Sequence, residues 1–389
     1  MQNFVFHNPT KVLFGRQTLA AIGSETRLLG KRALLVYGQE SLRASGTLAQ
    51  IKGHLHQAGV SCAEFGGIQA NPLLSKVRQG ILKVRAEEIE VIIGAGGGSV
   101  IDTAKAIAAG SMVAHDVWKF FTGKKSVRAT LPLLAVSTLP GSGSEMNHGM
   151  VLTHDQSREK FGFGHRLLHP QTAILDPELT FSLPAEQTAY GAVDAICHIL
   201  EFYLSTQDPD TPVQDRLMEG LINNGMEACE RCLADPCDYE ARASLMWTAC
   251  LALNGLTAAG LGRIEMVMHL LEHSLSGLYD TPHGAGLAAL LPGWLHHFAR
   301  SRPERLAQLG AGLFPRSGTG DDRERRLNHC IEAFLGWLEA IQVPTSLEAL
   351  QIPSQDHPRI AAHTSGLAKV WRMRQYSPAF FEDILQGCR

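Results

Sequence analysis

Residues 91–108 read VIIGAGGGSVIDTAKAIA: a short apolar run, a cluster of glycines, and a stretch with helical character. A strand that enters a helix through such a turn presents bare backbone N–H groups and the positive end of a helix dipole, where a phosphate can bind. The turn is not a Walker loop, and Ser99 replaces the third glycine of a strict G-x-G-x-x-G pattern. The segment predicts a phosphate cradle in a parallel α/β fold, and a purely structural turn remains the alternative.

A second loop supports a role in ligand binding. Residues 137–145, STLPGSGSE, follow another apolar run and bring hydroxyl groups and glycines to its carboxyl end. In open parallel sheets, ligands bind at the carboxyl ends of the strands. Two such loops indicate one long ligand, such as a dinucleotide.

The chain changes character near Pro184. Before it, short β-branched runs alternate with helical segments, which is typical of a parallel sheet with crossover helices. The runs that we expect to be strands are residues 32–37, 91–94, 131–136 and 172–175. After it, apolar periods near 3.6 recur, as in residues 216–233, 241–258 and 326–341. We therefore expect a Rossmann-like dinucleotide-binding α/β domain over residues 1–183 and an all-α C-terminal domain over residues 184–389.

The charge and hydropathy of the chain argue against two kinds of partner. The formal net charge is −3 over 389 residues, and no run of Lys and Arg is interleaved with aromatic residues, so we expect no nucleic acid partner. No uninterrupted apolar stretch reaches the ~18 residues that span a bilayer, and the first residues do not read as a secretory signal. The sequence predicts a cytoplasmic protein that does not bind a membrane.

The eight cysteines do not form a dense framework. Cys229 and Cys232 form a C-x-x-C with Cys237 nearby, but a four-thiolate zinc site would need a second pair. We expect free thiols.

Five polar residues in apolar surroundings indicate a metal site in the second domain. Asp194 and His198 are four residues apart on one apolar helix, and so are His269 and His273, while His283 lies in a Thr-Pro-His-Gly break. Burial of such groups is costly unless they are paired or coordinated. A core histidine or a simple hydrogen bond would explain each pair alone. Together they favour a divalent metal, and a set without thiolates suits Zn²⁺ or Fe²⁺.

With a pyrophosphate turn in one half and an Asp/His set in the other, the sequence resembles the iron-containing (group III) alcohol dehydrogenases over its full length. The matching segments are Asn8-Pro9-Thr10, Phe14-Gly15, Asn71-Pro72, Gly96-Gly97-Gly98-Ser99, Thr281-Pro282-His283-Gly284 and Leu291-Pro292. Phe65-Gly66-Gly67-Ile68 and Ala252-Leu253-Asn254-Gly255-Leu256 are most similar to the NADP(H)-dependent butanol dehydrogenase and aldehyde reductase branch.

The resemblance implies a role for each candidate site residue. The implied ligands of one Fe²⁺ or Zn²⁺ are Asp194, His198, His269 and His283. His273 corresponds to a family histidine beside the nicotinamide and the substrate. The implied cofactor contacts are Gly97, Gly98, Ser99, Asp102, Thr138, Ser142 and Lys160, although Lys160 alone would read as a solvated surface lysine. The family also implies a homodimer.

The implied reaction is reversible hydride transfer between NAD(P)H and a small aldehyde, giving a primary alcohol. The metal would act as a Lewis acid on the carbonyl oxygen, and His273 is the candidate proton relay and catalytic residue. NAD enzymes commonly place a carboxylate after the strand that here ends at Tyr37, but this chain has Gly38 there. With Ser41 and Arg43 as donors to a 2′-phosphate, and in spite of Glu40, we expect NADP(H) to be favoured over NAD(H).

Two other functions remain open. Residues 269–273 spell H-x-x-E-H, so a zinc metallopeptidase would use His269 and His273 as ligands and Glu272 as its general base. This function would leave the glycine turn and Asp194 with His198 unexplained. A non-enzymatic nucleotide-binding or structural metal protein is the second alternative.

Overall fold

The computed structural model of the protein describes residues 1–206, 210–314 and 323–388. Contacts between residues divide the chain into two compact units. The sheet unit comprises His7–Leu183 and Pro236–Cys250, and the helical unit comprises Met1–Phe6, Pro184–Asp235 and Leu251–Arg389. The predicted boundary at Pro184 therefore does not separate the two units completely. Met1–Phe6 precedes it but belongs to the helical unit, and Pro236–Cys250 follows it but belongs to the sheet unit.

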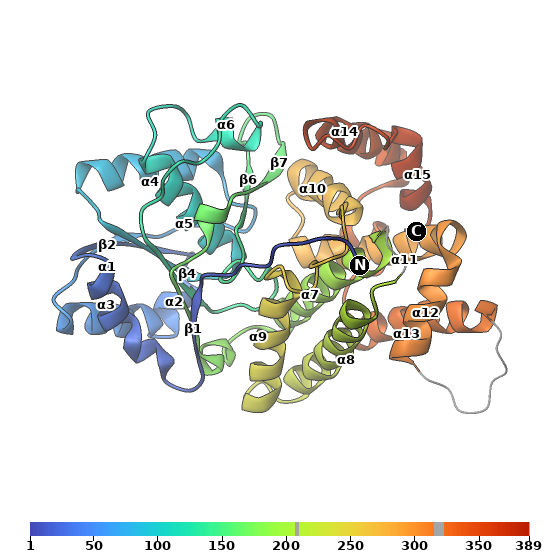
Figure 1. Ribbon diagram of the computed structural model, residues 1–389, viewed down its shortest axis with the longest axis horizontal. Helices are drawn as coiled ribbons and strands as arrows, with labels where there is room; N and C mark the ends of the chain where they lie inside the picture. The colour runs from blue at the N-terminus through green and yellow to red at the C-terminus, as the bar shows by residue number, and fades with distance from the viewer. Residues whose placement is uncertain (207–209, 315–322, 389) are drawn as a thin grey trace. The chain divides into compact units, whose positions relative to one another are not determined.

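The sheet unit is built on six parallel strands in the order β1-β8-β5-β4-β2-β3 (Figure 1). Their bounds are Lys11–Phe14 for β1, Arg32–Tyr37 for β2, Ser61–Phe65 for β3, Val91–Gly96 for β4, Leu133–Ser137 for β5 and Thr172–Leu175 for β8. Along the chain, β5 is followed by a separate antiparallel hairpin of β6 (Gly149–Thr153) and β7 (Lys160–Gly164), and β8 comes after it. The four predicted strand segments all form strands in this sheet.

Helices cover both faces of the sheet, as expected for strands that are apolar on both sides. Their bounds are Ile22–Leu29 for α1, Ser41–Ala44 for α2, Thr47–Gln57 for α3, Leu74–Ala86 for α4, Gly98–Ser111 for α5 and Trp118–Phe121 for α6. Alternate strand residues such as Leu35 and Ile93 share one core with Ile22 and Ile51 of α1 and α3. On the other face, a Cβ on Gly94 would lie 3.0 Å from the Cβ of Ala104 in α5, so this glycine lets α5 approach the strand closely.

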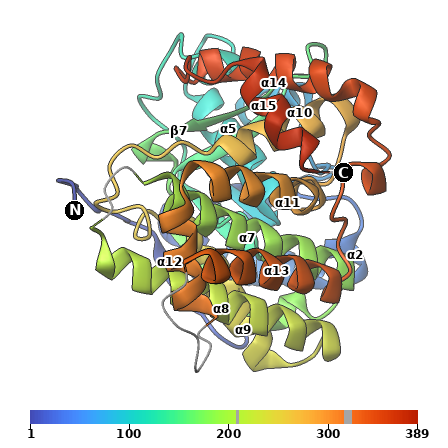
Figure 2. The ribbon, with the colours of Figure 1, turned by 90° about the vertical axis from the view of Figure 1, so that its right-hand side faces the viewer.

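In the rest of the chain, the described elements longer than one turn are all α-helices. Their bounds are Ala185–Ser205 for α7, Pro212–Ala234 for α8, Tyr239–Leu253 for α9, Val267–Tyr279 for α10, His283–Ser301 for α11, Pro303–Leu313 for α12, Arg323–Ala340 for α13, His357–Val370 for α14 and Pro378–Gln386 for α15. Within the helical unit, α7 packs against α8 and α11 (Figure 2). It is buried almost all round from Thr188 to Leu204, so polar groups on it need partners inside the protein.

The predicted fold class, an α/β dinucleotide-binding domain followed by an all-α domain, is therefore confirmed. The sequence did not predict β1, β3 or the β6–β7 hairpin. Nor did it predict that most of α9 belongs to the sheet unit, where Trp247 packs edge-on against Phe14 at a ring-centroid distance of 5.7 Å.

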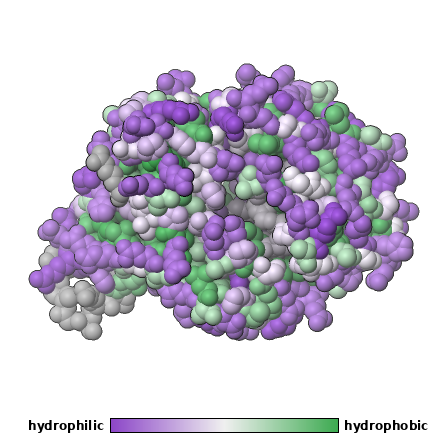
Figure 3. Space-filling view, turned by 180° about the vertical axis from the view of Figure 1, so that it is seen from behind, coloured by the Kyte–Doolittle hydropathy of each residue, from purple (hydrophilic) through white to green (hydrophobic). Residues whose placement is uncertain are grey.

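The face seen in Figure 3 is covered mostly by hydrophilic side chains, and hydrophobic ones gather there in separate patches. Among the described helices, none is long and apolar enough to cross a membrane.

Candidate metal centre and cofactor site

Three predicted ligands lie together inside the helical unit. Helix α7 carries Asp194 and His198, and α10 carries His269; one ligand atom of each lies within 4.8 Å of the others. The Oδ1 atom of Asp194 is 3.5 Å from Nε2 of His269 and 3.3 Å from a ring nitrogen of His198. His283, the first residue of α11, brings its Nε2 to 3.5 Å from the same oxygen. Nitrogen atoms of three histidines, each from a different helix, therefore surround one oxygen of Asp194.

Two buried glutamates hold the imidazoles in place, and the sequence analysis did not assign them this role. Nδ1 of His269 is hydrogen-bonded to Glu201, which also accepts the backbone N–H of Met268 at 2.6 Å. Nδ1 of His283 is hydrogen-bonded to Glu272. Metal-binding histidines characteristically donate their outer nitrogen to a carboxylate, which fixes the ring and leaves the other nitrogen for the ion. The position of Glu201 on α7, seven residues after Asp194 on the same apolar face, could have indicated that it supports the metal ligands.

The negative charge of the cluster suits a bound cation. Burial lowers the pKa of His198 to about 3, so its ring is neutral near pH 7. Burial raises the pKa of Asp194, but His198 and His283 outweigh it and hold that pKa well below its usual value. Burial lowers the pKa of His269, yet Glu201 and Asp194 together raise it to about 9. Without a bound ion the ring of His269 is therefore protonated near pH 7, and it must release this proton to become a metal ligand. The negative charge of Glu201 and Asp194 that holds the proton favours a bound cation in its place.

One further observation fits a metal ion. Nδ1 of His198, the ring nitrogen 3.3 Å from Oδ1 of Asp194, is buried and forms no hydrogen bond to any described residue. An unsatisfied buried nitrogen is costly, and coordination would satisfy it. The residues therefore fit a divalent ion held by Asp194, His198, His269 and His283.

His273 lies beside this cluster. It is one turn beyond His269 on α10 and 4% exposed, and its ring centroid is 6.1 Å from that of His283. Trp371 packs edge-on against the same ring, at a centroid distance of 5.6 Å. The peptidase interpretation is not supported, because Glu272 is fully buried and its two carboxylate oxygens are hydrogen-bonded to Ser276 and His283. It is therefore not placed to activate a water molecule.

The two predicted loops of the sheet unit lie against each other. Strands β4 and β5 are neighbours, and the N–H of Thr138 donates to the carbonyl oxygen of Gly96 over 3.1 Å. A Cβ on Gly98 would lie 2.3 Å from Oγ of Ser142, so a larger residue at position 98 would displace the Ser142 side chain. Helix α5 begins at Gly98 with Gly97 as its N-cap and no capping side chain, so its first N–H groups lack partners within the helix. Gly97, Gly98 and Ser99 stay partly exposed.

Two other predicted cofactor residues make contacts within the sheet unit. Asp102 is buried, and its oxygens accept hydrogen bonds from Oγ of Ser144 at 2.5 Å and from the N–H of Val151 at 2.8 Å. Lys160 is 4% exposed, and its Nζ donates to Oδ1 of Asn71 over 2.9 Å. It is therefore not a solvated surface lysine.

Charged side chains gather at the carboxyl ends of β2 and β3. The guanidinium of Arg43 donates to the hydroxyl of Tyr37 over 3.1 Å and lies 3.9 Å from the carboxylate of Glu64 and 3.8 Å from that of Glu40. Gly38 accepts a backbone hydrogen bond from Gly67 there, and Ser41 is the exposed first residue of α2. Arg43 is thus exposed but already near two carboxylates.

A parallel sheet with a glycine-rich turn before α5, and a buried Asp/His set on helices, define a dinucleotide-dependent, metal-dependent oxidoreductase. Comparison with known proteins makes the class specific. The profile described as iron-containing alcohol dehydrogenase matches residues 9–177, and that of the C-terminal part of the Fe-containing alcohol dehydrogenase family matches residues 188–387. The chain belongs to the iron-containing alcohol dehydrogenase family. Family membership implies a nicotinamide cofactor and a divalent metal.

Individual relatives cover almost the whole chain. The chain is 37% identical to the probable NADH-dependent butanol dehydrogenase 1 of Bacillus subtilis over 93% of both sequences. It is 33% identical to the NADPH-dependent aldehyde reductase YqhD of Escherichia coli over 89% of both. The crystal structure of NADH-dependent butanol dehydrogenase A from Thermotoga maritima matches with a TM-score of 0.94 and 39% identity, covering 100% of this chain and 99% of the other.

Proposed function

We propose that the protein catalyses reversible hydride transfer between NAD(P)H and a small aldehyde, giving a primary alcohol. The observation that carries the proposal is the convergence of Asp194, His198, His269 and His283, with carboxylates behind two of the rings, in a chain of this family. Its relatives are named for butanol dehydrogenase and aldehyde reductase activity. A divalent ion held there would supply Lewis acidity to the carbonyl oxygen and stabilise negative charge that develops on it.

We infer that His273 relays the proton. Its imidazole lies beside the metal-ligand set without belonging to it, and an unperturbed imidazole titrates near pH ~6.5. A ring nitrogen of His273 would deliver a proton to the alcohol oxygen in reduction and remove it in oxidation. Trp371, packed on the ring, would hold its orientation and exclude water.

The test separates the two kinds of histidine. In His283→Ala we expect the metal content and the aldehyde-dependent oxidation of NAD(P)H to fall together. In His273→Ala we expect full metal content, a lower kcat and an altered pH profile of kcat. Metal is measured by elemental analysis and turnover by nicotinamide absorbance, with straight-chain aldehydes of two to eight carbons and added Fe(II) or Zn(II). Full metal content in His283→Ala, or loss of metal in His273→Ala with full content in Asp194→Ala, would contradict the assignment.

We further propose that NADPH is preferred over NADH. Arg43 supports this, because its exposed guanidinium stands where a 2′-phosphate would follow β2, with Ser41 nearby. Glu40 and Glu64 weaken the attraction. A charge-assisted contact contributes roughly 1.5 to 3 kcal/mol, or about ten- to a hundredfold in binding.

The ratio of kcat/KM for NADPH to that for NADH is therefore expected to exceed one, to fall in Arg43→Ala and to rise in Glu40→Gln. Arg128→Ala is the control, because Arg128 is exposed and lies elsewhere on the sheet unit. A ratio of one in the wild type, or a ratio that Arg43→Ala leaves unchanged, would refute this part of the proposal.

We also propose a homodimer, on the family resemblance and on the amino-terminal segment. Phe4, Val5 and Phe6 are 51%, 94% and 45% exposed, and β1 is an edge strand of the sheet. Exposed apolar residues and an unpaired sheet edge are each features of association surfaces. Light scattering on the wild type and on Val5→Glu is the test; a monomeric wild type would contradict the proposal.

A further inference from the structure

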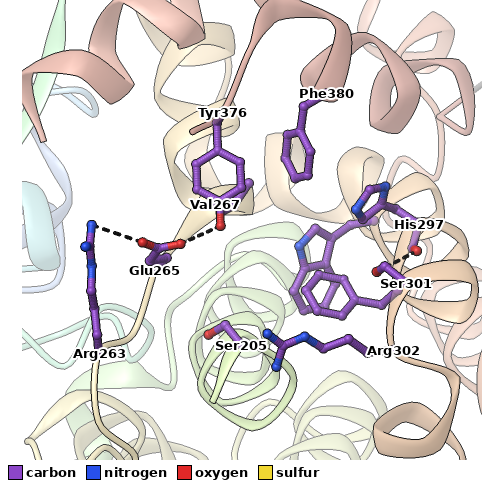
Figure 4. Close-up of a pocket in the computed structure, with 11 residues that line it drawn as sticks. Ser205, Arg263, Glu265, Val267, His297, Ser301, Arg302, Tyr376 and Phe380 are labelled. Atoms are coloured by element: carbon purple, nitrogen blue, oxygen red, sulfur yellow. Dashed lines mark hydrogen bonds and ion pairs between the residues drawn. The ribbon is translucent and has the colours of Figure 1, made fainter. Parts of the chain in front are cut away.

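The helical unit contains a cavity of about 170 Å³ that the proposed reaction does not use (Figure 4). It lies between the carboxyl end of α7, the amino end of α10, the carboxyl half of α11 and the segment that begins α15. The metal-ligand residues lie elsewhere on these helices, and none of them is among the described residues that line the cavity. The cavity is therefore a site distinct from the metal-ligand set.

The apolar wall of the cavity is aromatic. Trp294 and Phe298 on α11 have ring centroids 4.6 Å apart, and Tyr376 and Phe380 are also 4.6 Å apart. In Figure 4 the rings of Tyr376 and Phe380 point into the space. An apolar cavity of roughly 150 Å³ holds one benzene molecule. The space therefore admits an apolar body of one ring.

The carboxylate in the cavity is already satisfied. Glu265 forms an ion pair with Arg263 at 3.0 Å. It also accepts hydrogen bonds from the amide of Gln375 at 2.7 Å and from the hydroxyl of Tyr376 at 2.5 Å. Arg263 also neutralises its charge. Glu265 therefore has little capacity left to bind a ligand donor.

The donors in the cavity are not satisfied. The guanidinium of Arg302 has five N–H groups, and it donates to the carbonyl oxygen of Thr206 over 2.6 Å but to no other described residue. In Figure 4 it extends from α11 toward Ser205 across the space. Nε1–H of Trp294, a residue only 1% exposed, has no acceptor among the described residues. A buried donor without an acceptor is destabilising. A ligand that brings an acceptor group into the cavity would therefore be favoured.

The charges of the lining indicate which acceptor fits. Arg263 and Arg302 carry two positive charges against the single negative charge of Glu265, and His297 is hydrogen-bonded to Asp383. One net positive charge, spare N–H donors and an aromatic wall complement a monoanion with an apolar body. A carboxylate matches a guanidinium in geometry as well as in charge.

We propose that this cavity binds a small monocarboxylate with an apolar body the size of one benzene ring, its carboxylate facing Arg302 and its body among Trp294, Phe298 and Phe380. The site lies outside the proposed reaction centre and does not depend on the proposed function.

Titration calorimetry of the metal-loaded protein with benzoate tests the proposal, with benzamide as the neutral probe of the same shape. We expect one benzoate per chain and benzamide binding at least tenfold weaker. Arg302→Gln should weaken benzoate binding about tenfold to a hundredfold, the effect of losing a charge-assisted contact. Trp294→Phe should weaken it several-fold while keeping an aromatic ring. Arg300→Gln is the matched control, because Arg300 lies in the last turn of α11, two residues before Arg302, but does not line the cavity.

A carboxylate could also bind the proposed metal ion, so Asp194→Asn is titrated as well and should bind benzoate like the wild type. The proposal is overturned if the wild type shows no saturable binding, or if benzamide binds as tightly as benzoate. It is also overturned if Asp194→Asn abolishes binding. If Arg302→Gln fails to fold, Trp294→Phe decides, and wild-type affinity in that variant overturns the proposal.

Discussion

The replacement of Glu201 by Gln tests how the fold prepares the metal ligands. Glu201 is fully buried on α7, and it fixes His269 by accepting from Nδ1 of the ring and from the backbone N–H of Met268. Glutamine keeps the shape and one acceptor oxygen but removes the negative charge behind the imidazole. Loss of such an outer carboxylate typically costs 10- to 100-fold in metal affinity, or roughly 1.4 to 2.7 kcal/mol. We expect Kd for Zn²⁺ to rise by that factor.

The assay is competition for Zn²⁺ with a chromophoric chelator near pH 7.5, together with aldehyde turnover at saturating and at limiting metal. We expect Glu201→Gln to need more metal for half-maximal turnover and to recover most of kcat at saturation. Glu186→Gln is the control on the same helix, since Glu186 is exposed in the first turn of α7. An unchanged Kd in Glu201→Gln, with an intact fold by circular dichroism, would refute the argument that this carboxylate orients and polarises His269.

Three further outcomes follow from the sheet unit. Gly98→Ala places a Cβ 2.3 Å from Oγ of Ser142, so we expect KM for the nicotinamide cofactor to rise at least tenfold. The double variant Gly98→Ala/Ser142→Gly should recover part of the loss. An unchanged KM in Gly98→Ala would contradict the close approach of the loops. Burial lowers the pKa of Lys105 to about 8, so the unfolded chain binds more protons between pH 8 and about 10.5. Over that range the contribution of Lys105 should make the free energy of unfolding rise with pH, by at most about 4 kcal/mol, and Lys105→Met should flatten the rise in urea titrations. Lys160→Met leaves Oδ1 of Asn71 without this donor, so we expect weaker cofactor binding by fluorescence titration, whereas Lys124→Met on the exposed surface should bind normally.

The parts of the structure that the sequence predicted are those that leave a local pattern. Strands β2 and β4 are continuous apolar runs, and the glycines of the turn between β4 and α5 indicate a phosphate-binding site. Asp194 with His198 was visible because a carboxylate and an imidazole one turn apart are costly on an apolar helix.

The parts that escaped prediction depend on contacts between distant residues. Glu201 orients His269, which is 68 residues away, and the sequence around Glu201 does not indicate this partner. Asp102 likewise makes its hydrogen bonds to residues of the segment between β5 and β6 and of β6 itself. The apolar residues between positions 241 and 258 predicted a helix there, but they did not indicate which core α9 would join.

The position of α9 also determines how the protein can be divided. Met246 and Cys250 of this helix complete a small core with Met146 and Leu175, and Sγ of Cys250 donates to Glu145 over 2.8 Å. A fragment that ends at residue 183 would therefore expose Leu175 and remove the thiol donor of Glu145. Recombination with a homologue at that point would pair a sheet from one parent with a covering helix from the other. A chimera that retains a native sheet core must inherit residues 236–250 together with residues 7–183.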